Sequence, residues 1–159
     1  VSGNAWLHQE SNGAYALSIK ALKYLIKIKS EHKSDKPAVS VTFVISQKNM
    51  DEIIPFYNHL SLLGADTVNF NPYTLDNSYF FNLESTYEKD EFWIRRNNIS
   101  KLRGIMKELC LLKSGNVIPL ITNSIYQLNA IPKYFEKKEK YKKGICLAGF
   151  NYFHITNFR

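Results

Sequence analysis

The sequence predicts an α/β domain built around a parallel sheet, and three observations support this. Segments with helical periodicity alternate with short, β-branched, apolar segments, as in consecutive βαβ units. The strongest strand candidate, residues 39–45 (VSVTFVI), is so apolar that we expect both of its faces to be buried, which is typical of a parallel strand covered by helices. The length of 159 residues and the hydrophobic fraction of 45% fit one globular domain or a large part of a bigger one.

The first helix is expected over residues 14–33, ahead of that strand. Its apolar residues recur at spacings of four, four and three, and we expect the resulting stripe to face the core: Leu17, Ala21, Leu25 and Ile28. Pro37 disfavours helix at the residue before it, so the helix should end before the strand begins.

The second helix is expected over residues 50–63. Asn49 and Glu52 have the spacing of a capping box, and Gly64 is a favourable residue for the C-terminal cap. A short apolar segment, residues 67–71 (TVNFN), then predicts a second strand.

Further elements are expected in the second half of the chain. An apolar stripe predicts a helix over residues 97–113, and residues 117–121 should form a third strand. A fourth helix should follow, capped by Asn123 and kinked or divided by Pro132. The aromatic segment 150–156 (FNYFHIT) predicts a last strand.

Composition excludes several classes of protein. Ten Phe, ten Tyr and two Trp supply too much apolar surface for a disordered chain, and no apolar run approaches the roughly 18 residues of a membrane helix. The chain opens VSGNAWLHQE, which lacks the features of a secretory signal. Two cysteines cannot build a disulfide framework, so we expect a reducing compartment, a cytoplasmic location and no membrane partner.

The net charge of +7 and the pI near 9.3 favour association with anions. The positive charge gathers in residues 20–36 and 133–143, where interspersed acids are typical of the solvated faces of helices. The charge leaves open a self-contained basic α/β domain that binds nucleic acid or another polyanion. The chain contains neither an RNA-recognition motif nor a zinc finger.

Motifs for catalysis are scarce in this sequence. It contains no P-loop, no G-x-G-x-x-G, no nucleophile elbow and no H-E-x-x-H. In a parallel α/β sheet, ligands bind beyond the carboxyl ends of the strands, which selects residues 2–4, 46–49, 69–73 and 122–124. These segments are polar but almost uncharged, so they suit cofactor binding better than general acid–base catalysis.

The stretch KPAVSVTFVISQKNMDEIIPFYNHLSLLGADTVNF combines a strand, an Asn, a helix, the letters LGAD and a second strand. This order, with the preceding strand end VSGNA, resembles the second half of the barrel in radical S-adenosylmethionine (SAM) enzymes. KYFEKKEKYKKGICLAGFNYFHIT is similar to the entry of the SPASM or twitch extension of that family. The resemblance implies the C-terminal half of a partial (β/α)6 TIM-like barrel over residues 1–143. The first strand of an auxiliary module would follow over residues 144–159.

The same resemblance implies an enzyme that binds SAM and iron–sulfur clusters and generates a substrate radical. The positions that match its cofactor-binding strand ends are Ser2, Asn4, Val44, Ile45, Ser46, Val68, Asn69 and Phe70. Cys146 matches the first ligand of an auxiliary 4Fe–4S cluster. The C-x-x-x-C-x-x-C loop of the SAM-cleaving 4Fe–4S cluster is absent, so its ligands should lie outside residues 1–159 and this chain alone should be inactive.

Simpler roles for these residues stay open. Ser2 and Asn4 could belong to a frayed terminus, and composition alone would make Cys146 a buried thiol. Cys110, one turn after Met106 on an apolar stripe, is expected to be a small core residue.

The connection over residues 72–93 is long and aromatic, and loops of this length inside a domain are usually functional. We expect Tyr73, Tyr79 and Phe80 to bind substrate, with a loop that only plugs the barrel end as the alternative. Peptide modification is frequent among SPASM relatives. The resemblance therefore implies a peptide or protein substrate and an electron donor as partners, and no nucleic acid.

Overall fold

A computed structural model describes residues 13–74, 90–115 and 118–136 of the chain. Its elements follow in this order: α2 (Ala14–Glu31), β1 (Ser40–Ile45), η1 (Met50–Glu52), α3 (Ile53–Leu63), β2 (Thr67–Pro72), η2 (Arg96–Asn98), α5 (Ile99–Ser114), β3 (Leu120–Ile121) and α6 (Ile125–Glu136). The strands form an open parallel sheet in the order β1–β2–β3, with Thr67 opposite both Ser40 and Leu120. The predicted α/β class with parallel strands is confirmed. The boundary expected between residues 143 and 144 and the strand expected over 150–156 lie outside the described residues.

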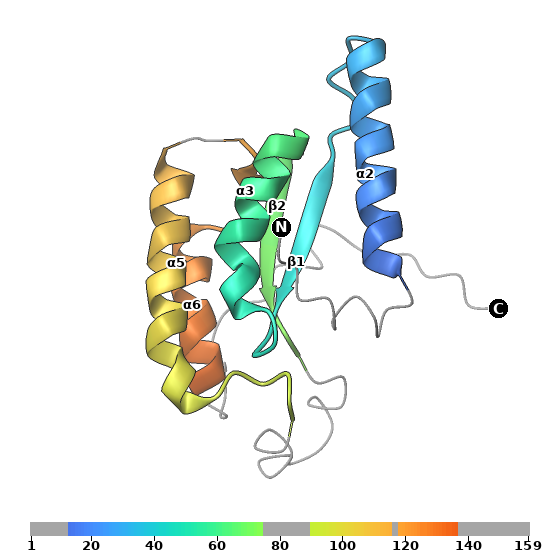
Figure 1. Cartoon of the computed structure of the whole chain (residues 1–159). Helices are drawn as coiled ribbons and strands as arrows, with labels where there is room; N and C mark the ends of the chain where they lie inside the picture. Colours follow the sequence, from blue (N-terminus) through green and yellow to red (C-terminus); the bar gives the residue numbers. More distant parts are fainter. Residues whose placement is uncertain (1–12, 75–89, 116–117, 137–159) are drawn as a thin grey trace, which may run out of the picture.

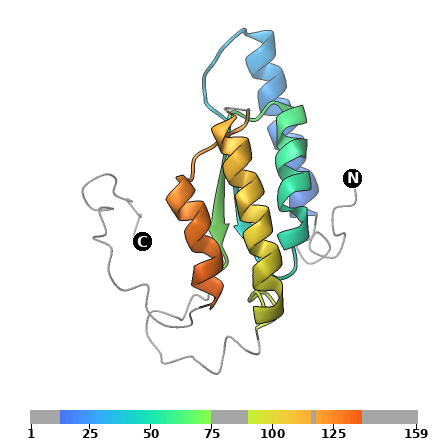
Figure 2. The ribbon, with the colours of Figure 1, turned by 90° about the vertical axis from the view of Figure 1, so that its left-hand side faces the viewer.

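Helices α3 and α5 lie on one face of the sheet, and α6 packs against α5 and runs beside β2 (Figures 1 and 2). Successive strand residues point to opposite faces, so alternate residues of β1 and β2 turn towards these helices and are buried: Phe43, Ile45, Val68 and Phe70. The Phe43 ring centroid lies 6.0 Å from that of Phe70 and 5.0 Å from that of Phe56 in α3. The core of the described fold therefore lies between the sheet and these helices.

The opposite face of the sheet, which we call the open face, is covered by none of the described elements. Expecting both faces of residues 39–45 to be buried was wrong, because Ser40, Thr42 and Val44 are exposed and Val44 keeps 49% of its surface. The β2 residues beside them in register are Thr67, Asn69 and Asn71. Most of these side chains are polar, so contact with water costs the open face little.

Helix α2 lies beside β1, and the stripe that it buries differs from the predicted one (Figure 1). Leu22 is only 8% exposed, and Ile19 and Ile26 pack against the core. Leu17 and Leu25 of the predicted stripe are 67% and 44% exposed. The apolar residues of α2 form one broad arc opposite Lys20, Lys23 and Lys27, so periodicity does not say which part of this arc meets the sheet.

An ion pair helps to determine which side of α2 faces inward. Lys29 Nζ donates to Oδ2 of Asp66 at 2.6 Å, and the same oxygen accepts the N–H of Val39 at 2.6 Å. The hydrogen bond from Lys29, followed by that from Val39, holds the pKa of Asp66 below its ordinary value. Asp66 therefore ties α2 and the start of β1 to the turn before β2.

Of the two caps predicted for α3, only the C-terminal one is confirmed. Gly64 ends the helix as predicted, with a left-handed φ of 86° and its N–H directed at the carbonyls of Leu60 and Ser61. The predicted capping box at Asn49 and Glu52 is wrong. The Asn49 side chain makes no cap hydrogen bond, because it binds the end of β1 instead.

The start of α6 is also capped differently from the prediction. Ser124 Oγ accepts the N–H of Gln127 at 3.1 Å, and Gln127 Oε1 accepts the N–H of Ser124 at 2.7 Å. This is a capping box, and it moves the cap from Asn123 to Ser124.

The course of α6 also corrects an expectation. The helix continues through Pro132, so the predicted division is wrong; buried side chains on both sides of the proline, including Leu128 and Phe135, hold the two halves in one packed helix. α6 runs beside β2 in the direction of the strands and ends near their carboxyl ends (Figures 1 and 2).

Strand β3 has two residues where five were expected. Pro119, which immediately precedes it, has no N–H to donate to a ladder. On the other side of the strand, Lys113 Nζ donates to the carbonyl of Ile121 at 2.7 Å. A lysine at this position restricts further pairing along that edge.

Candidate functional site at the carboxyl ends of the strands

A row of uncharged polar side chains crosses the open face. Thr122 Oγ1 lies 3.2 Å from Oδ1 of Asn69, and Asn69 Nδ2 donates to Oδ1 of Asn71 at 3.0 Å. The register places Thr42 of β1 beside Asn69, so the row spans all three strands. These hydrogen bonds leave the Asn71 Nδ2 group facing out from the row. The open face therefore offers amide and hydroxyl groups to a ligand at the carboxyl half of the sheet.

The end of β2 is held by the buried side chain of Asn123. Its Oδ1 accepts the N–H of Phe70 at 2.7 Å, and its Nδ2 donates to the carbonyl of Phe70 at 3.0 Å. β3 has already ended at this level, so the amide takes the place of a neighbouring strand. Because Phe70 is fixed, its neighbours Asn69 and Asn71 are fixed on the open face.

The end of β1 is held in the same way by Asn49. Its Oδ1 accepts the N–H of Ser46 at 2.8 Å and lies 3.2 Å from the Ser46 hydroxyl, while its Nδ2 donates to the carbonyl of Val44 at 2.8 Å. Ser46 is buried as a result. Asparagine amides thus fix two adjacent strand ends.

The two ends of the long connection meet beside these strand ends. Tyr73 donates its N–H to the carbonyl of Ile45 at 2.8 Å and its hydroxyl to Oδ2 of Asp90 at 3.2 Å. The other oxygen of Asp90 accepts the N–H of Phe92 at 2.7 Å, and the Phe92 ring lies 5.5 Å from that of Tyr73. The connection therefore leaves and rejoins the described fold at one place.

The turn after β1 binds the returning end of this connection. Gln47 donates its N–H to the carbonyl of Phe92 at 2.8 Å and accepts the N–H of Arg95 on its side-chain oxygen at 2.9 Å. Lys48 pairs with Glu91 at 2.8 Å. Hydrogen bonds and an ion pair thus attach the connection to the edge where the strands end.

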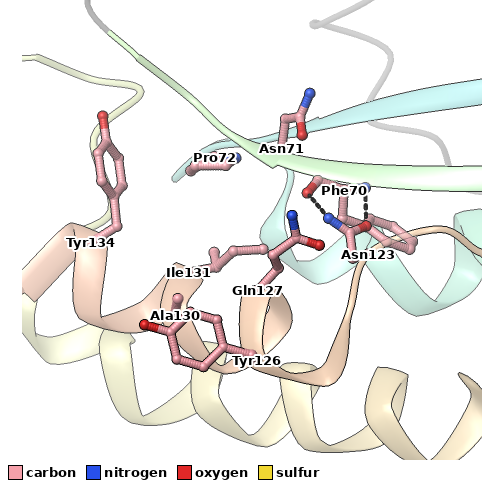
Figure 3. Close-up of a pocket in the computed structure, with 9 residues that line it drawn as sticks. All are labelled: Phe70, Asn71, Pro72, Asn123, Tyr126, Gln127, Ala130, Ile131 and Tyr134. Atoms are coloured by element: carbon pink, nitrogen blue, oxygen red, sulfur yellow. Dashed lines mark hydrogen bonds between the residues drawn. The ribbon is translucent and has the colours of Figure 1, made fainter. Parts of the chain in front are cut away.

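A pocket of about 310 Å³ lies between the second half of β2 and α6 (Figure 3). Phe70, Asn71 and Pro72 border it on the strand side, and Asn123, just before α6, also lines it. Side chains from α6 form its other walls: Tyr126, Gln127, Ala130, Ile131 and Tyr134. Sequence reasoning missed this pocket, because its walls combine a strand end with a helix more than 50 residues later in the chain.

The structure divides the predicted cofactor-binding residues among different surroundings. Val44 and Asn69 lie on the open face. Ile45, Val68 and Phe70 are fully buried on the helix side, so only their backbone could meet a ligand. Ser2 and Asn4 lie outside the described residues.

The other predicted site residues are placed as follows. Tyr73 is one end of the long connection and bonds to Asp90. Tyr79, Phe80 and Cys146 lie outside the described residues. Asn71 and Thr122 belong to the polar row but were not named as ligands, although both lie in expected rim segments. Asn71 lies two residues after Asn69 in β2, and Thr122 directly follows Ile121, which pairs with Val68; these positions are the signal that finds them.

The described residues contain no group of three or more His, Cys, Asp or Glu side chains that could hold a metal ion. Cys110 is partly buried against the core, as predicted, and burial raises the pKa of its thiol. A protonated thiol is a poor metal ligand. The same ranges include no helix long and apolar enough to cross a membrane.

Comparisons of the chain with protein-family models, curated proteins and solved structures find no significant match.

Proposed function

We propose that the chain is part of a radical SAM enzyme and that its sheet forms one wall of the SAM-binding barrel. The observation that carries this proposal is the open face: parallel strands in sequential order carry helices on one face and uncharged polar side chains on the other. In a (β/α) barrel the helices lie outside and the opposite strand face lines the interior. An arc of three strands with these two faces agrees with the resemblance in the sequence.

The residues of the open face fit SAM. The adenosine and amino-acid parts of SAM carry many hydrogen-bonding groups, and the side chains of Asn69, Asn71 and Thr122 can both donate and accept. Val44, half exposed beside Asn71 in register, offers an apolar contact to the adenine ring. When bound to a reduced 4Fe–4S cluster, SAM supplies the radical that starts the reaction on the substrate.

Cluster ligands and substrate contacts come from other parts of the chain in this proposal. The SAM-cleaving cluster is held by cysteines outside residues 1–159, and Cys146 holds an auxiliary cluster. α6 ends near the carboxyl ends of the strands (Figure 1). The sequence that leads to Cys146 therefore begins at the edge of the sheet where the proposed SAM site lies. The long connection starts and ends there too, and in this proposal its residues Tyr79 and Phe80 contact a peptide or protein substrate.

A first test concerns the reading frame that encodes the chain. With about 30 residues per βαβ unit, the C-x-x-x-C-x-x-C motif should lie roughly 80 to 110 residues before Val1. An upstream start codon without these cysteines would overturn the proposal.

A second test measures SAM binding to the full-length protein by calorimetry. Asn71→Ala and Thr122→Ala should each weaken binding about 3- to 10-fold, the worth of one hydrogen bond. Asn58→Ala is the matched control. Asn58 is exposed on α3, the helix that lies on the side of the sheet away from the open face, so its replacement should leave the affinity for SAM unchanged. Equal affinities of all these variants for SAM would show that SAM does not bind at the open face.

The alternative proposal is a basic domain that binds a polyanion. In the described ranges, five basic side chains already pair with carboxylates: Lys27, Lys29, Lys48, Lys101 and Arg103. Salt-dependent retention on immobilised heparin, together with an absence of SAM binding, would favour a polyanion-binding domain instead.

A further inference from the structure

The pocket between β2 and α6 shares Asn71 with the open face, but its walls from α6 play no part in the proposed SAM site. The rings of Tyr126 and Tyr134 stand at its sides, with Ala130 and Ile131 between them and Pro72 opposite (Figure 3). Its volume of about 310 Å³ is at the lower limit of ordinary ligand pockets. A cavity of this size suits one ring-bearing side chain better than a whole cofactor.

The polar groups of the pocket are neutral. None of the described residues that line it carries a charge. Gln127 uses its Oε1 in the capping box, and its Nε2, directed towards β2, has no partner in the described part of the chain (Figure 3).

The strand side of the pocket supplies an acceptor. In β2 the backbone groups of Val68 and Phe70 face the β3 side, where Thr122 and Asn123 bind them. By the same alternation the carbonyl of Pro72 faces this side at a level that β3 does not reach. The pocket thus combines aromatic walls with neutral polar groups, among them the Gln127 Nε2 donor and the Pro72 carbonyl.

We propose that this pocket binds an aromatic side chain presented by a second polypeptide, whose adjacent peptide group is held by Gln127 Nε2 and the Pro72 carbonyl. A peptide group carries one acceptor and one donor, which complements this pair. Two tyrosine rings favour an inserted ring through stacked or edge-to-face contacts, and the lack of charge disfavours acidic and basic side chains. The inference does not depend on radical chemistry.

The test is a titration of the 159-residue chain, followed by NMR, with N-acetyl-phenylalaninamide, which carries one ring and neutral amides. Saturable shifts should appear for Tyr126, Ala130 and Tyr134. N-acetyl-glycinamide, which lacks the ring, should bind at least about fivefold more weakly, in line with the worth of an aromatic contact. Equal responses to both probes would overturn the proposal.

Variants separate the pocket from other surfaces. Ala130→Leu fills the cavity and should abolish binding of the phenylalanine probe. Gln127→Glu keeps the oxygen that caps α6 but loses the Nε2 donor, so binding should weaken. Asn129→Ala, an exposed change on the same helix, should bind as the unaltered chain does. If Ala130→Leu loses its helical circular dichroism, Gln127→Glu decides; unchanged binding by Gln127→Glu would then refute the assignment.

Discussion

Replacing Asn123 by alanine would remove the side chain that binds both the N–H and the carbonyl of Phe70. Phe70 is fully buried, so both backbone groups would lose their partner away from water. Each buried group left unsatisfied costs about 1–3 kcal/mol, so the free energy of unfolding should fall by about 2–6 kcal/mol. That loss is large against the total of about 5–15 kcal/mol typical of a native domain.

Urea denaturation of the 159-residue chain, followed by circular dichroism, measures this loss. The matched control is Asn129→Ala, which removes the same amide from an exposed position on α6 and should change the free energy of unfolding by less than about 0.5 kcal/mol. Equal unfolding free energies for Asn123→Ala and Asn129→Ala would refute the role assigned to the Asn123 amide.

Asn123→Asp tests the two hydrogen bonds separately. An ionised aspartate still accepts the Phe70 N–H, but its second oxygen faces the Phe70 carbonyl, and burial disfavours the charge. Protonation supplies a donor for that carbonyl. The deficit relative to the unaltered chain, compared at each pH, should therefore be largest near neutrality and shrink as the pH falls. A deficit that does not vary with pH would contradict this account.

Four further predictions follow from other parts of the chain. Leu22→Ala should lower the free energy of unfolding by about 2–5 kcal/mol in urea denaturation, and Leu17→Ala by less than about 0.5 kcal/mol, because only Leu22 is buried; the reverse order would restore the stripe predicted from periodicity. The lowered pKa of Asp66 contributes stability that is present above its ordinary value of 3.8 and is lost as the pH falls through its lower folded-state value, so the melting temperature of Asp66→Asn should vary less with pH across that interval than that of the unaltered chain. In the full-length protein, reconstituted without oxygen, Cys146→Ala should reduce the iron and sulfide at the auxiliary site while Cys110→Ala leaves them unchanged; unaltered iron in both would make Cys146 a core thiol. In the same protein, Tyr79→Ala with Phe80→Ala should impair substrate turnover more than uncoupled SAM cleavage, and an equal loss of both would favour a loop that only plugs the barrel.

The sequence was sufficient to predict β1, β2 and the helices of the described residues, because each depends on local signals. Alternating apolar residues located β1 and β2 to within a residue, and Gly64 located the end of α3. The side of α2 that faces the core could not be predicted, since its apolar arc is broad and the ion pair that fixes it joins Lys29 to Asp66, 37 residues away. The burial of β1 was overestimated for a related reason. Whether a strand face is buried depends on which other elements cover it, and the sequence of the strand alone does not show this.

Of the candidate site, the sequence predicted the edge but not the geometry. The carboxyl-end rule selected the segments that contain Asn69, Asn71 and Thr122, and the structure brings these side chains into one row. The same rule could not separate residues that face a ligand from those that face the core, because successive residues of a strand alternate between the two. Asn49 and Asn123 were interpreted as caps because a cap is the commonest local role of asparagine before a helix.

The two misread asparagines explain how the open face can stay available to a ligand. At the carboxyl ends of β1 and β2, backbone groups need partners that the neighbouring strands do not supply. In each case a side-chain amide supplies one donor and one acceptor, which satisfies the strand end from within the fold. The side chains of Val44, Asn69 and Asn71 are then not required to close the ladder, whereas Thr122 Oγ1 also lies 3.3 Å from the carbonyl of Val68. A ligand on this face would meet preorganised side chains, so binding would incur little cost from ordering the protein.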